Sequence, residues 1–433
     1  MKRPIVIVLL TVALTLVCLG IGAVVFFAFN NGFPTNNPFI SQDVSSVLEE
    51  SKTLKVDTES PVILNVINDL GKVTIIGADV TTVQIDVIKT AYDSTLEKAD
   101  QEVKAIKYSI EQNDNTIGVK YEVPNLNDFS EYNTVDFFIT VPNQTSTNIE
   151  ANFGEVNVSN TKGTVDIASD FGDVSVQNIE GALTLENSSG EIEISNVDAG
   201  SQDVQITADF GKITLDKVNG KDVNVNSNSG SITLNNVRAT GDIFSKSDFG
   251  IVTFENGSAA SVTIESSSGK VSITKVNIRG TLVITNDFGD IELNQVMAGS
   301  YDLDSNSGGI TIDGAKGSLK AQTDFGSIDI KNAENVTVDL KSNSGGVDFS
   351  GSLGEGPHMI QSDFGGITLT IPVDSQLNVD LNTDFGSISS DIPITVTLDG
   401  DLEKNHQTGS MNGGGAQLTV KTNNGSIDIT AIK

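Results

Sequence analysis

The sequence contains no tryptophan, and its only cysteine is Cys18. A single cysteine excludes a disulfide bond within the chain. Because Cys18 lies inside an apolar N-terminal segment, a cysteine-based metal site or nucleophile in the rest of the chain is excluded as well. Histidine is almost as scarce: His358 and His406 are the two occurrences, and neither has a recognisable catalytic partner nearby in the sequence.

Positive charge is also in short supply. The 26 lysines and arginines face 57 aspartates and glutamates, so the formal net charge is −31. Such a chain cannot neutralise phosphates, and we therefore exclude nucleic acid as a partner. Anionic lipids or glycans would need bridging cations. The simplest reason for the charge is the solubility of an elongated surface protein, and cation binding is the alternative.

One long apolar run stands out, from Pro4 to Phe29, directly after Lys2 and Arg3. Its length exceeds the roughly 20 residues that a helix needs to cross a bilayer, and the preceding basic residues place the N-terminus in the cytoplasm. A cleaved signal peptide is the alternative, but its apolar core is usually only about 7–15 residues. We expect residues 1–29 to form a cytoplasmic tip and transmembrane signal anchor, and residues 30–54 to form a linker.

Glycine recurs at a nearly fixed interval, and this repeat determines the predicted fold. The spacing is 18–21 residues except for a final interval of 39, which we interpret as two periods with a loop around residues 405–415. The glycines are Gly154, Gly172, Gly190, Gly211, Gly230, Gly250, Gly269, Gly289, Gly308, Gly326, Gly345, Gly365, Gly386 and Gly425. The second residue after each is Val or Ile, and the fourth is apolar except at Ser390. The fifth and seventh residues before the glycine are apolar in most repeats, with His358 as an exception.

This alternation is typical of strands with one buried face, so each repeat contains two short strands. Apolar residues seven after the glycine, such as Ile179 and Val197, indicate a third inward contact. Strands this short can bury a core when coils stack at about 4.8 Å. We predict an all-β fold, a single-stranded parallel β-helix (β-solenoid) of about 14 coils of ~19 residues over residues 151–433. A β-propeller is the alternative, because blades of about 40 residues would match a doubled repeat.

The repeat is indeed doubled. Asp-Phe-Gly precedes the strand in alternate repeats, from Asp170–Gly172 to Asp384–Gly386, and Ser-Ser-Gly or Asn-Ser-Gly stands between. The aligned aspartates could form a weak Ca²⁺ ladder, but they would lie about 9–10 Å apart, so we favour turn capping. The aligned phenylalanines could form an exposed track for a glycan or peptide. We favour packing of the rings at a corner of the solenoid, where the large phenylalanine of one coil and the small serine of the next would fill the space together.

Enzymes also occur among β-helix proteins, so catalysis must be considered. Two pairs of carboxylates on strand faces, Glu191 with Glu193 and Asp290 with Glu292, are candidates for acid–base chemistry. They stand in ordinary repeats, and Arg238 and Arg279 are the only arginines of the repeat region. We predict no catalytic residues, no metal and no cofactor.

The turn motifs resemble those of a bacterial putative-adhesin family of domains of unknown function with β-strand repeats. The matching segments are Asn187–Ile192 (NSSGEI), Ser266–Val271 (SSSGKV) and Asn306–Ile310 (NSGGI). Residues 68–75, a short helix at 96–106 and the segment 413–427 resemble the family's usual beginning and end. We therefore treat residues 55–150 as an N-terminal β-rich cap region, whose helix we expect to cover the solenoid's open end.

The resemblance implies a right-handed, surface-exposed or envelope-associated solenoid without a settled activity. We predict a non-catalytic, membrane-anchored scaffold or adhesin-like binding protein of the bacterial cell membrane, single-pass, with its C-terminal domain extracytoplasmic. The possible ligand is a cell-surface glycan or protein. Alternatives are an envelope-stress sensor or regulator that acts through membrane partners, and a polysaccharide-cleaving enzyme. The sequence does not indicate the oligomeric state.

Overall fold

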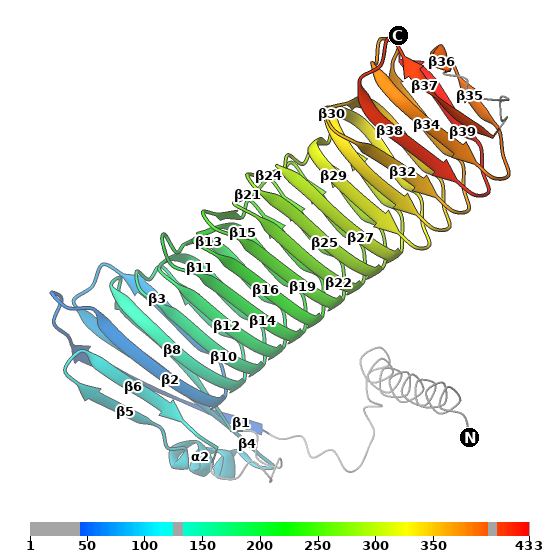
Figure 1. Ribbon diagram of the computed structural model, residues 1–433. Helices are drawn as coiled ribbons and strands as arrows, with labels where there is room; N and C mark the ends of the chain where they lie inside the picture. Colours follow the sequence, from blue (N-terminus) through cyan, green and yellow to red (C-terminus); the bar gives the residue numbers. More distant parts are fainter. Residues whose placement is uncertain (1–43, 124–132, 397–404, 433) are drawn as a thin grey trace, which may run out of the picture.

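The computed structural model describes residues 44–123, 133–396 and 405–432. These residues form an elongated rod in which strands lie side by side across the long axis (Figure 1). Every strand belongs to one continuous hydrogen-bonded sheet system that winds as a solenoid. The predicted all-β β-solenoid is therefore confirmed, and the β-propeller alternative is wrong.

Each coil has one strand before its glycine and one after it. The strands before the glycine are β8 (Thr145–Phe153), β10 (Val165–Phe171), β12 (Leu183–Ser189), β14 (Val204–Phe210), β16 (Val223–Ser229), β19 (Ile243–Phe249), β22 (Val262–Ser268), β25 (Thr281–Phe288), β27 (Ser300–Ser307) and β29 (Lys316–Thr323). The strands after it are β9 (Val156–Ser159), β11 (Val174–Glu180), β13 (Ile192–Asp198), β15 (Ile213–Gly220), β17 (Ile232–Asn235), β20 (Val252–Glu255), β23 (Val271–Thr274), β26 (Ile291–Asn294), β28 (Ile310–Asp313) and β30 (Ile328–Ser342). β31 (Val347–Leu353), β32 (His358–Ser362) and β33 (Ile367–Pro372) continue the winding.

Equivalent residues of successive coils pair in parallel, so each apolar position becomes a row inside the rod. Val165 pairs with Leu183, and Val174 pairs with Ile192. These side chains are fully buried, while the residues between them face outward. The rows make one continuous core, which is what individually short strands need in order to bury apolar area.

The third inward contact is present. Ile179, Val197, Val218 and their equivalents are buried, and three coils add a short third strand. These strands are β18 (Arg238–Ala239), β21 (Ser258–Ala259) and β24 (Asn277–Ile278).

The winding has about 11 turns, fewer than the 14 coils predicted. The prediction counted every glycine as one more coil in chain order. Beyond β33 the chain departs from that order: β38 (Ala416–Thr422) pairs with both β32 and β34 (Leu377–Thr383). In the same way, β39 (Ile427–Ile432) lies between β33 and β35 (Ile388–Ser390). The C-terminal strands are therefore inserted between two coils that precede them in the sequence (Figure 1).

The loop expected around residues 405–415 is largely a strand. β37 (His406–Met411) runs antiparallel to β34 and also pairs with β36 (Ile394–Val396). Antiparallel pairing ends the stack at this side, because a strand of opposite direction does not continue the parallel winding.

At the other end, stacking begins earlier than residue 151. β2 (Val62–Leu70) and β3 (Val73–Ala78) already stack on β8 and β9. β6 (Thr116–Tyr121) and β7 (Thr134–Pro142) extend the two faces in parallel, and β5 (Ser109–Asn113), β4 (Thr82–Asp93) and β1 (Val44–Lys55) follow antiparallel. β1 thus occupies residues 44–54, which we expected to be linker.

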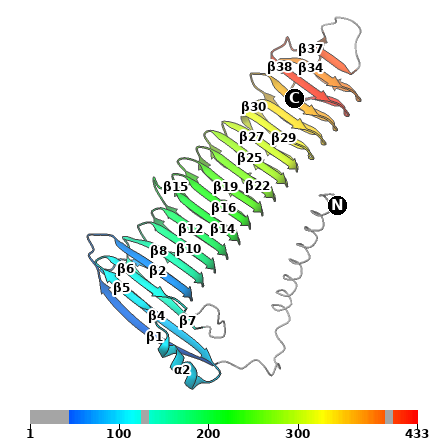
Figure 2. The ribbon, with the colours of Figure 1, turned by 60° about the horizontal axis from the view of Figure 1, so that its bottom comes forward.

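The predicted helix is confirmed as α2 (Leu96–Ala105), whose first turn is capped by the Thr95 hydroxyl accepting from the backbone N–H of Lys98. It buries Ala99 and Val103 and packs against β1 and β4 at the N-terminal end (Figure 2). The predicted anchor, Pro4–Phe29, lies outside the described residues. Within the described ranges, no helix has the length and apolarity needed to span a membrane.

Candidate functional site

The site is built on a ladder of glycines that forms one corner of the rod. A Cβ atom added to any glycine of this ladder from Gly154 onward would lie 1.8–2.4 Å from the carbonyl oxygen of the glycine stacked next to it. Gly71 of the cap region joins the same ladder below Gly154. Glycine is required because the backbones of successive coils approach too closely for a side chain.

A left-handed φ is a second reason for glycine at some of these positions, but not at all of them. That holds for Gly172 (φ 146°) and Gly289 (φ 137°), but Gly230 does not have such a φ. Its hypothetical Cβ lies 1.8 Å from the Gly211 carbonyl oxygen, so close approach is the requirement common to the whole ladder.

The phenylalanine before the glycine faces outward, so the predicted corner packing is wrong. Phe171 is 51% exposed and Phe385 is 77% exposed. The interior below the corner is instead occupied by small polar side chains three residues before the glycine, such as Ser247 and Thr323, which donate to glycine carbonyl oxygens. This narrow corner leaves no volume for a ring. We call the exposed row the Phe stripe; it consists of Phe153, Phe171, Phe210, Phe249, Phe288, Phe325, Phe364 and Phe385.

The spacing along the Phe stripe is regular from Phe171 onward. Phe210, for example, pairs with Ser189 on one side and Ser229 on the other. Phe364 and Phe385 are consecutive in the sequence pattern, but the inserted C-terminal coil places Asn424 between them. Only at the N-terminal end do two rings meet in adjacent coils: Phe153 and Phe171 stack with centroids 5.1 Å apart.

A row of aspartates flanks the Phe stripe, two residues before the glycine in the coils that carry the phenylalanines from Phe171 onward. The amide of the aligned asparagine in the next coil donates to the carboxylate: Asn228 Nδ2 lies 2.6 Å from Asp209 Oδ1, and Asn306 Nδ2 lies 2.7 Å from Asp287 Oδ1. The aspartates therefore link neighbouring coils, whereas we predicted that they cap their own turns.

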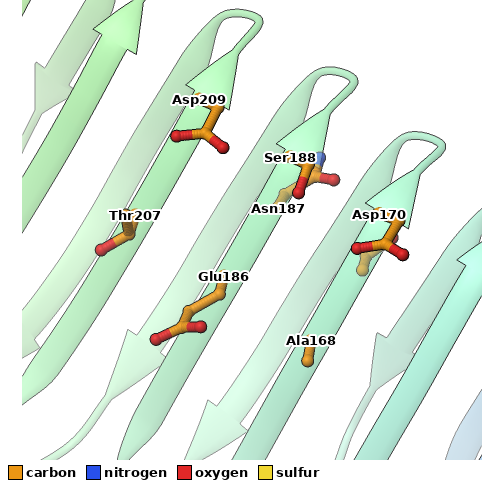
Figure 3. Close-up of a pocket in the computed structure, with 8 residues that line it drawn as sticks. Ala168, Asp170, Glu186, Asn187, Ser188, Thr207 and Asp209 are labelled. Carbon is orange, nitrogen blue, oxygen red and sulfur yellow. The ribbon is translucent and has the colours of Figure 1, made fainter.

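Beside this row the surface has two separate shallow polar depressions, one of which is shown in Figure 3. One depression of about 300 Å³ is lined by Ala168, Asp170, Glu186, Ser188, Thr207 and Asp209, from β10, β12 and β14. A second of about 240 Å³ is lined by Asp304, Asn306, Gln322, Asp324, Lys341 and Asn343. Both use the residues two and four before the glycine, so the same outward face is hollowed at two places along the rod.

The opposite flank of the Phe stripe, one residue after the glycine, changes along the rod. In the N-terminal half it carries large side chains, among them Glu191, Lys212, Ile251, Lys270 and Asp290. In the C-terminal half it carries only Gly309, Ser327, Gly346, Gly366, Ser426 and Ser387. In the C-terminal half, therefore, no large side chain stands on this flank of the Phe stripe.

Sequence reasoning missed a second ladder, six residues after the glycine. Asn160, Asn178, Asn196 and Asn236 all have φ values of 53–60° there, and Asn178 Nδ2 donates to Asn160 Oδ1 over 3.0 Å. Asparagine tolerates the left-handed conformation better than other residues with side chains, and its repetition at a fixed offset was the available signal.

The carboxylate pairs proposed for acid–base chemistry lie in ordinary coils, one at β13 and one at β26. Glu191 directly precedes β13 and Glu193 lies within it, and Asp290 and Glu292 have the same places at β26. Glu292 forms an ion pair with Lys270 (2.6 Å). In the part of the chain that the structure describes, no group of three or more His, Cys, Asp or Glu side chains is arranged to hold a metal ion.

The remaining candidates have structural partners. His358 is buried, with its Nε2 3.1 Å from the Gly354 carbonyl oxygen. His406 Nε2 lies 2.8 Å from Asp380 Oδ1. Arg279 donates from its guanidinium to the Thr240 carbonyl oxygen.

Fold and site together define a parallel β-solenoid repeat protein with an outward aromatic stripe. More narrowly, the family model described as Toastrack DUF4097 matches residues 73–256 and again residues 251–430, and the chain belongs to this family. The predicted resemblance to bacterial putative-adhesin domains of unknown function is confirmed. The double match agrees with a repeat pattern that runs through both halves of the rod.

Among solved structures, the chain is similar to a "putative adhesin" of Bacteroides fragilis NCTC 9343, with 15% identity, a TM-score of 0.28, and coverage of 66% of this chain and 97% of that one. A "putative cell adhesion protein" of Clostridium sporogenes ATCC 15579 shares 12% identity, with a TM-score of 0.17 and coverage of 89% and 100%. A "putative adhesin" of Parabacteroides merdae ATCC 43184 shares 14% identity, with a TM-score of 0.23 and coverage of 67% and 95%. No curated protein matches the sequence.

Proposed function

We propose that the protein is a non-catalytic scaffold of the bacterial cell surface that binds its partner, in the manner of an adhesin, through the Phe stripe. The single observation that carries this proposal is the outward placement of aligned phenylalanines, most of them more than half exposed. The scaffold is held to the membrane by residues 4–29, and the solenoid extends outside the cell.

The energetics of exposure support a binding role. Burying a Phe side chain contributes about 1.5–3 kcal/mol, a gain that the Phe stripe does not obtain within the folded chain. The alternate coils carry serine or asparagine at the same position and stack equally well, so the ladder itself does not need the rings. We therefore take this aligned row of exposed rings as the interaction site.

The absence of catalysis in this proposal rests on the placement of the carboxylates. Both candidate pairs lie in ordinary coils, Glu191 with Glu193 at β13 and Asp290 with Glu292 at β26, and Glu292 is engaged in an ion pair with Lys270. Acid–base hydrolysis needs two carboxyl groups that converge on one bond.

The proposal is tested with the full chain and a variant in which Phe210, Phe249 and Phe288 are all replaced by serine, the residue found at this position in neighbouring coils. Binding to purified bacterial envelopes is measured for both proteins. Each lost aromatic contact should weaken binding by roughly two- to tenfold. Because three contacts are removed together, we expect the variant to lose at least nine-tenths of the binding. A control variant, Met297→Ser with Val373→Ser, removes exposed apolar side chains elsewhere and should bind normally. Equal binding by the wild type and the Phe variant would refute the proposal.

The anchor is tested separately. Removing residues 1–43 should release the chain from the membrane fraction of expressing cells. Retention of the truncated chain in that fraction would show that residues 4–29 are not what holds the solenoid to the membrane.

A further inference from the structure

We propose that the partner is a straight, uncharged β-linked polysaccharide that lies along the Phe stripe parallel to the rod axis. This inference rests on the proposed function, in which the Phe stripe is the binding surface, and it specifies the chemical class of the ligand.

The first argument is repetition. From Phe171 to Phe385 the rings recur at every second coil, and the inserted C-terminal strands preserve this interval. Two strand spacings correspond to about 9.6 Å along the axis. A surface with the same group at each step matches a ligand that also repeats, such as a homopolymer, better than an irregular protein surface. In a β-1,4-linked polysaccharide every second sugar presents the same face, and two sugar rings span a length similar to two coils.

The second argument is the chemistry of one step. Each step offers a phenyl ring, an aspartate carboxylate and an asparagine or serine side chain, as in Phe288, Asp287 and Asn306. A pyranose ring has an apolar C–H face that packs on an aromatic ring, and hydroxyl groups at its edge that donate to carboxylates and amide oxygens. The shallow polar depression beside the stripe, lined by Asp304, Gln322 and Asp324 among others, adds further acceptors at this part of the rod.

The third argument is steric. Next to Phe325 and Phe364 the residues after the glycines are Ser327 and Gly366, which are small and leave room beside the rings for a chain of sugars. Next to Phe210 and Phe249 stand Lys212 and Ile251. The C-terminal half is therefore the stronger part of the site.

The negative charge of the protein decides which kinds of polymer can lie on the Phe stripe. It also argues against another copy of this chain as the partner. A copy would present the same period, but it would bring a second row of aspartates and a net charge of −31 against the first. Like-charge juxtaposition disfavours that pairing, and the same repulsion excludes anionic polysaccharides.

The test uses the full chain in detergent and oligomers of β-1,4-linked N-acetylglucosamine and of β-1,4-linked glucose, from disaccharide to octasaccharide. We expect affinity for at least one series to rise with every added disaccharide, because each engages one more ring of the same site. Replacing Phe288, Phe325 and Phe364 by serine should lower the octasaccharide affinity at least tenfold. Replacing Phe171, Phe210 and Phe249 should lower it less. The α-linked glucose octamer, which is curved, is the matched control and should bind at least tenfold more weakly.

Each contrary outcome identifies what has failed. One such outcome is that the variant with serine at Phe210, Phe249 and Phe288 loses envelope binding while neither oligosaccharide series binds the wild type. In that case the polysaccharide inference is wrong and the proposed function stands. A Phe-dependent dimer in sedimentation velocity, without sugar binding, would identify a second copy as the occupant. If the Phe variant keeps its envelope binding, the proposed function itself fails.

Discussion

Gly425 stacks directly on Gly365, so close that a Cβ on Gly425 would lie 2.1 Å from the Gly365 carbonyl oxygen. Gly386, which lies between them in the sequence, stacks on the far side of Gly425. The last strands of the chain, β38 and β39, therefore lie between two earlier coils and do not add a coil at the end of the stack. The consequence for the surface is that Asn424 separates Phe364 from Phe385 and keeps the alternation of large and small residues intact.

This order of the strands is tested by cysteine pairs. Gln361 on β32 pairs with Lys421 on β38, and Asn382 on β34 pairs with Lys421 from the other side. Adjacent strands lie about 4.8 Å apart, within disulfide range, whereas two spacings are too far. In a Cys18→Ser background, the pair Gln361→Cys with Lys421→Cys should oxidise to a disulfide, and Gln361→Cys with Asn382→Cys should not. Mass spectrometry after mild oxidation reads out both, and the opposite result would restore stacking in chain order.

The glycine ladder makes a second prediction. Gly289→Ala should destabilise the rod by at least about 2–4 kcal/mol, because the new methyl group meets the Gly269 backbone and the residue has φ 137°. Gly118→Ala is the matched control, since no atom lies within 4 Å of its Cβ position. Urea unfolding followed by circular dichroism measures both. Equal midpoints for the two variants would contradict the close-approach account of the ladder.

The outward orientation of the Phe stripe is tested by two phenylalanines of one coil. Phe249 is 64% exposed, whereas Phe254 is fully buried. Phe254→Ala should cost about 3–5 kcal/mol of unfolding free energy. Phe249→Ala should change it by no more than about 0.5 kcal/mol, as is usual for exposed sites. A large loss at Phe249 would mean that the ring packs against the corner after all.

His358 predicts a pH dependence of stability. Burial lowers its pKa below the ordinary value of 6.5. Its Nδ1 accepts from the Val338 backbone N–H (3.4 Å), which the protonated ring could not do. The unfolded chain therefore binds the proton more readily, so the contribution of His358 is complete above pH 6.5 and falls below it, by at most about 1.4 kcal/mol per pH unit. His358→Gln should flatten this part of the pH profile in thermal unfolding, and an unchanged profile would contradict this role of His358.

The core could be predicted from the sequence because it is a local pattern repeated many times. Val165, Ile167, Val174 and Val176 alternate with polar residues, and a period of two has one structural meaning when it recurs in register. The helix at Leu96–Ala105 was equally accessible, since its apolar spacing is local.

The sequence was sufficient to locate the candidate site, but not to decide whether its phenylalanine rings face the core or the solvent. The aligned phenylalanines are visible in the sequence, but alternation does not tell on which side a residue lies when the chain bends at a tight corner. Phe249 and Phe254 have the same side chain and opposite burial, and the difference arises from the approach of Gly250 to Gly230. Backbone contact between residues of different coils leaves no mark at the phenylalanine itself.

The order of the C-terminal strands was also beyond the sequence pattern. The interval between Gly386 and Gly425 fits two periods, and the choice between extending and inserting depends on which strand edges pair. Likewise, β1 begins at Val44 because it finds β4 as a partner, not because its own residues differ from a linker. Pairing partners are non-local, so composition does not determine them.

The most direct test of the Phe stripe as a binding surface is hydroxyl-radical footprinting of the full chain with and without bacterial envelopes. We predict that oxidation of Phe210, Phe249, Phe288 and Phe325 falls several-fold when envelopes are present. Tyr92 and Phe138, which are exposed in the cap region, serve as internal references and should be oxidised equally in both samples. Unchanged oxidation along the stripe under conditions in which the protein is bound would contradict the account.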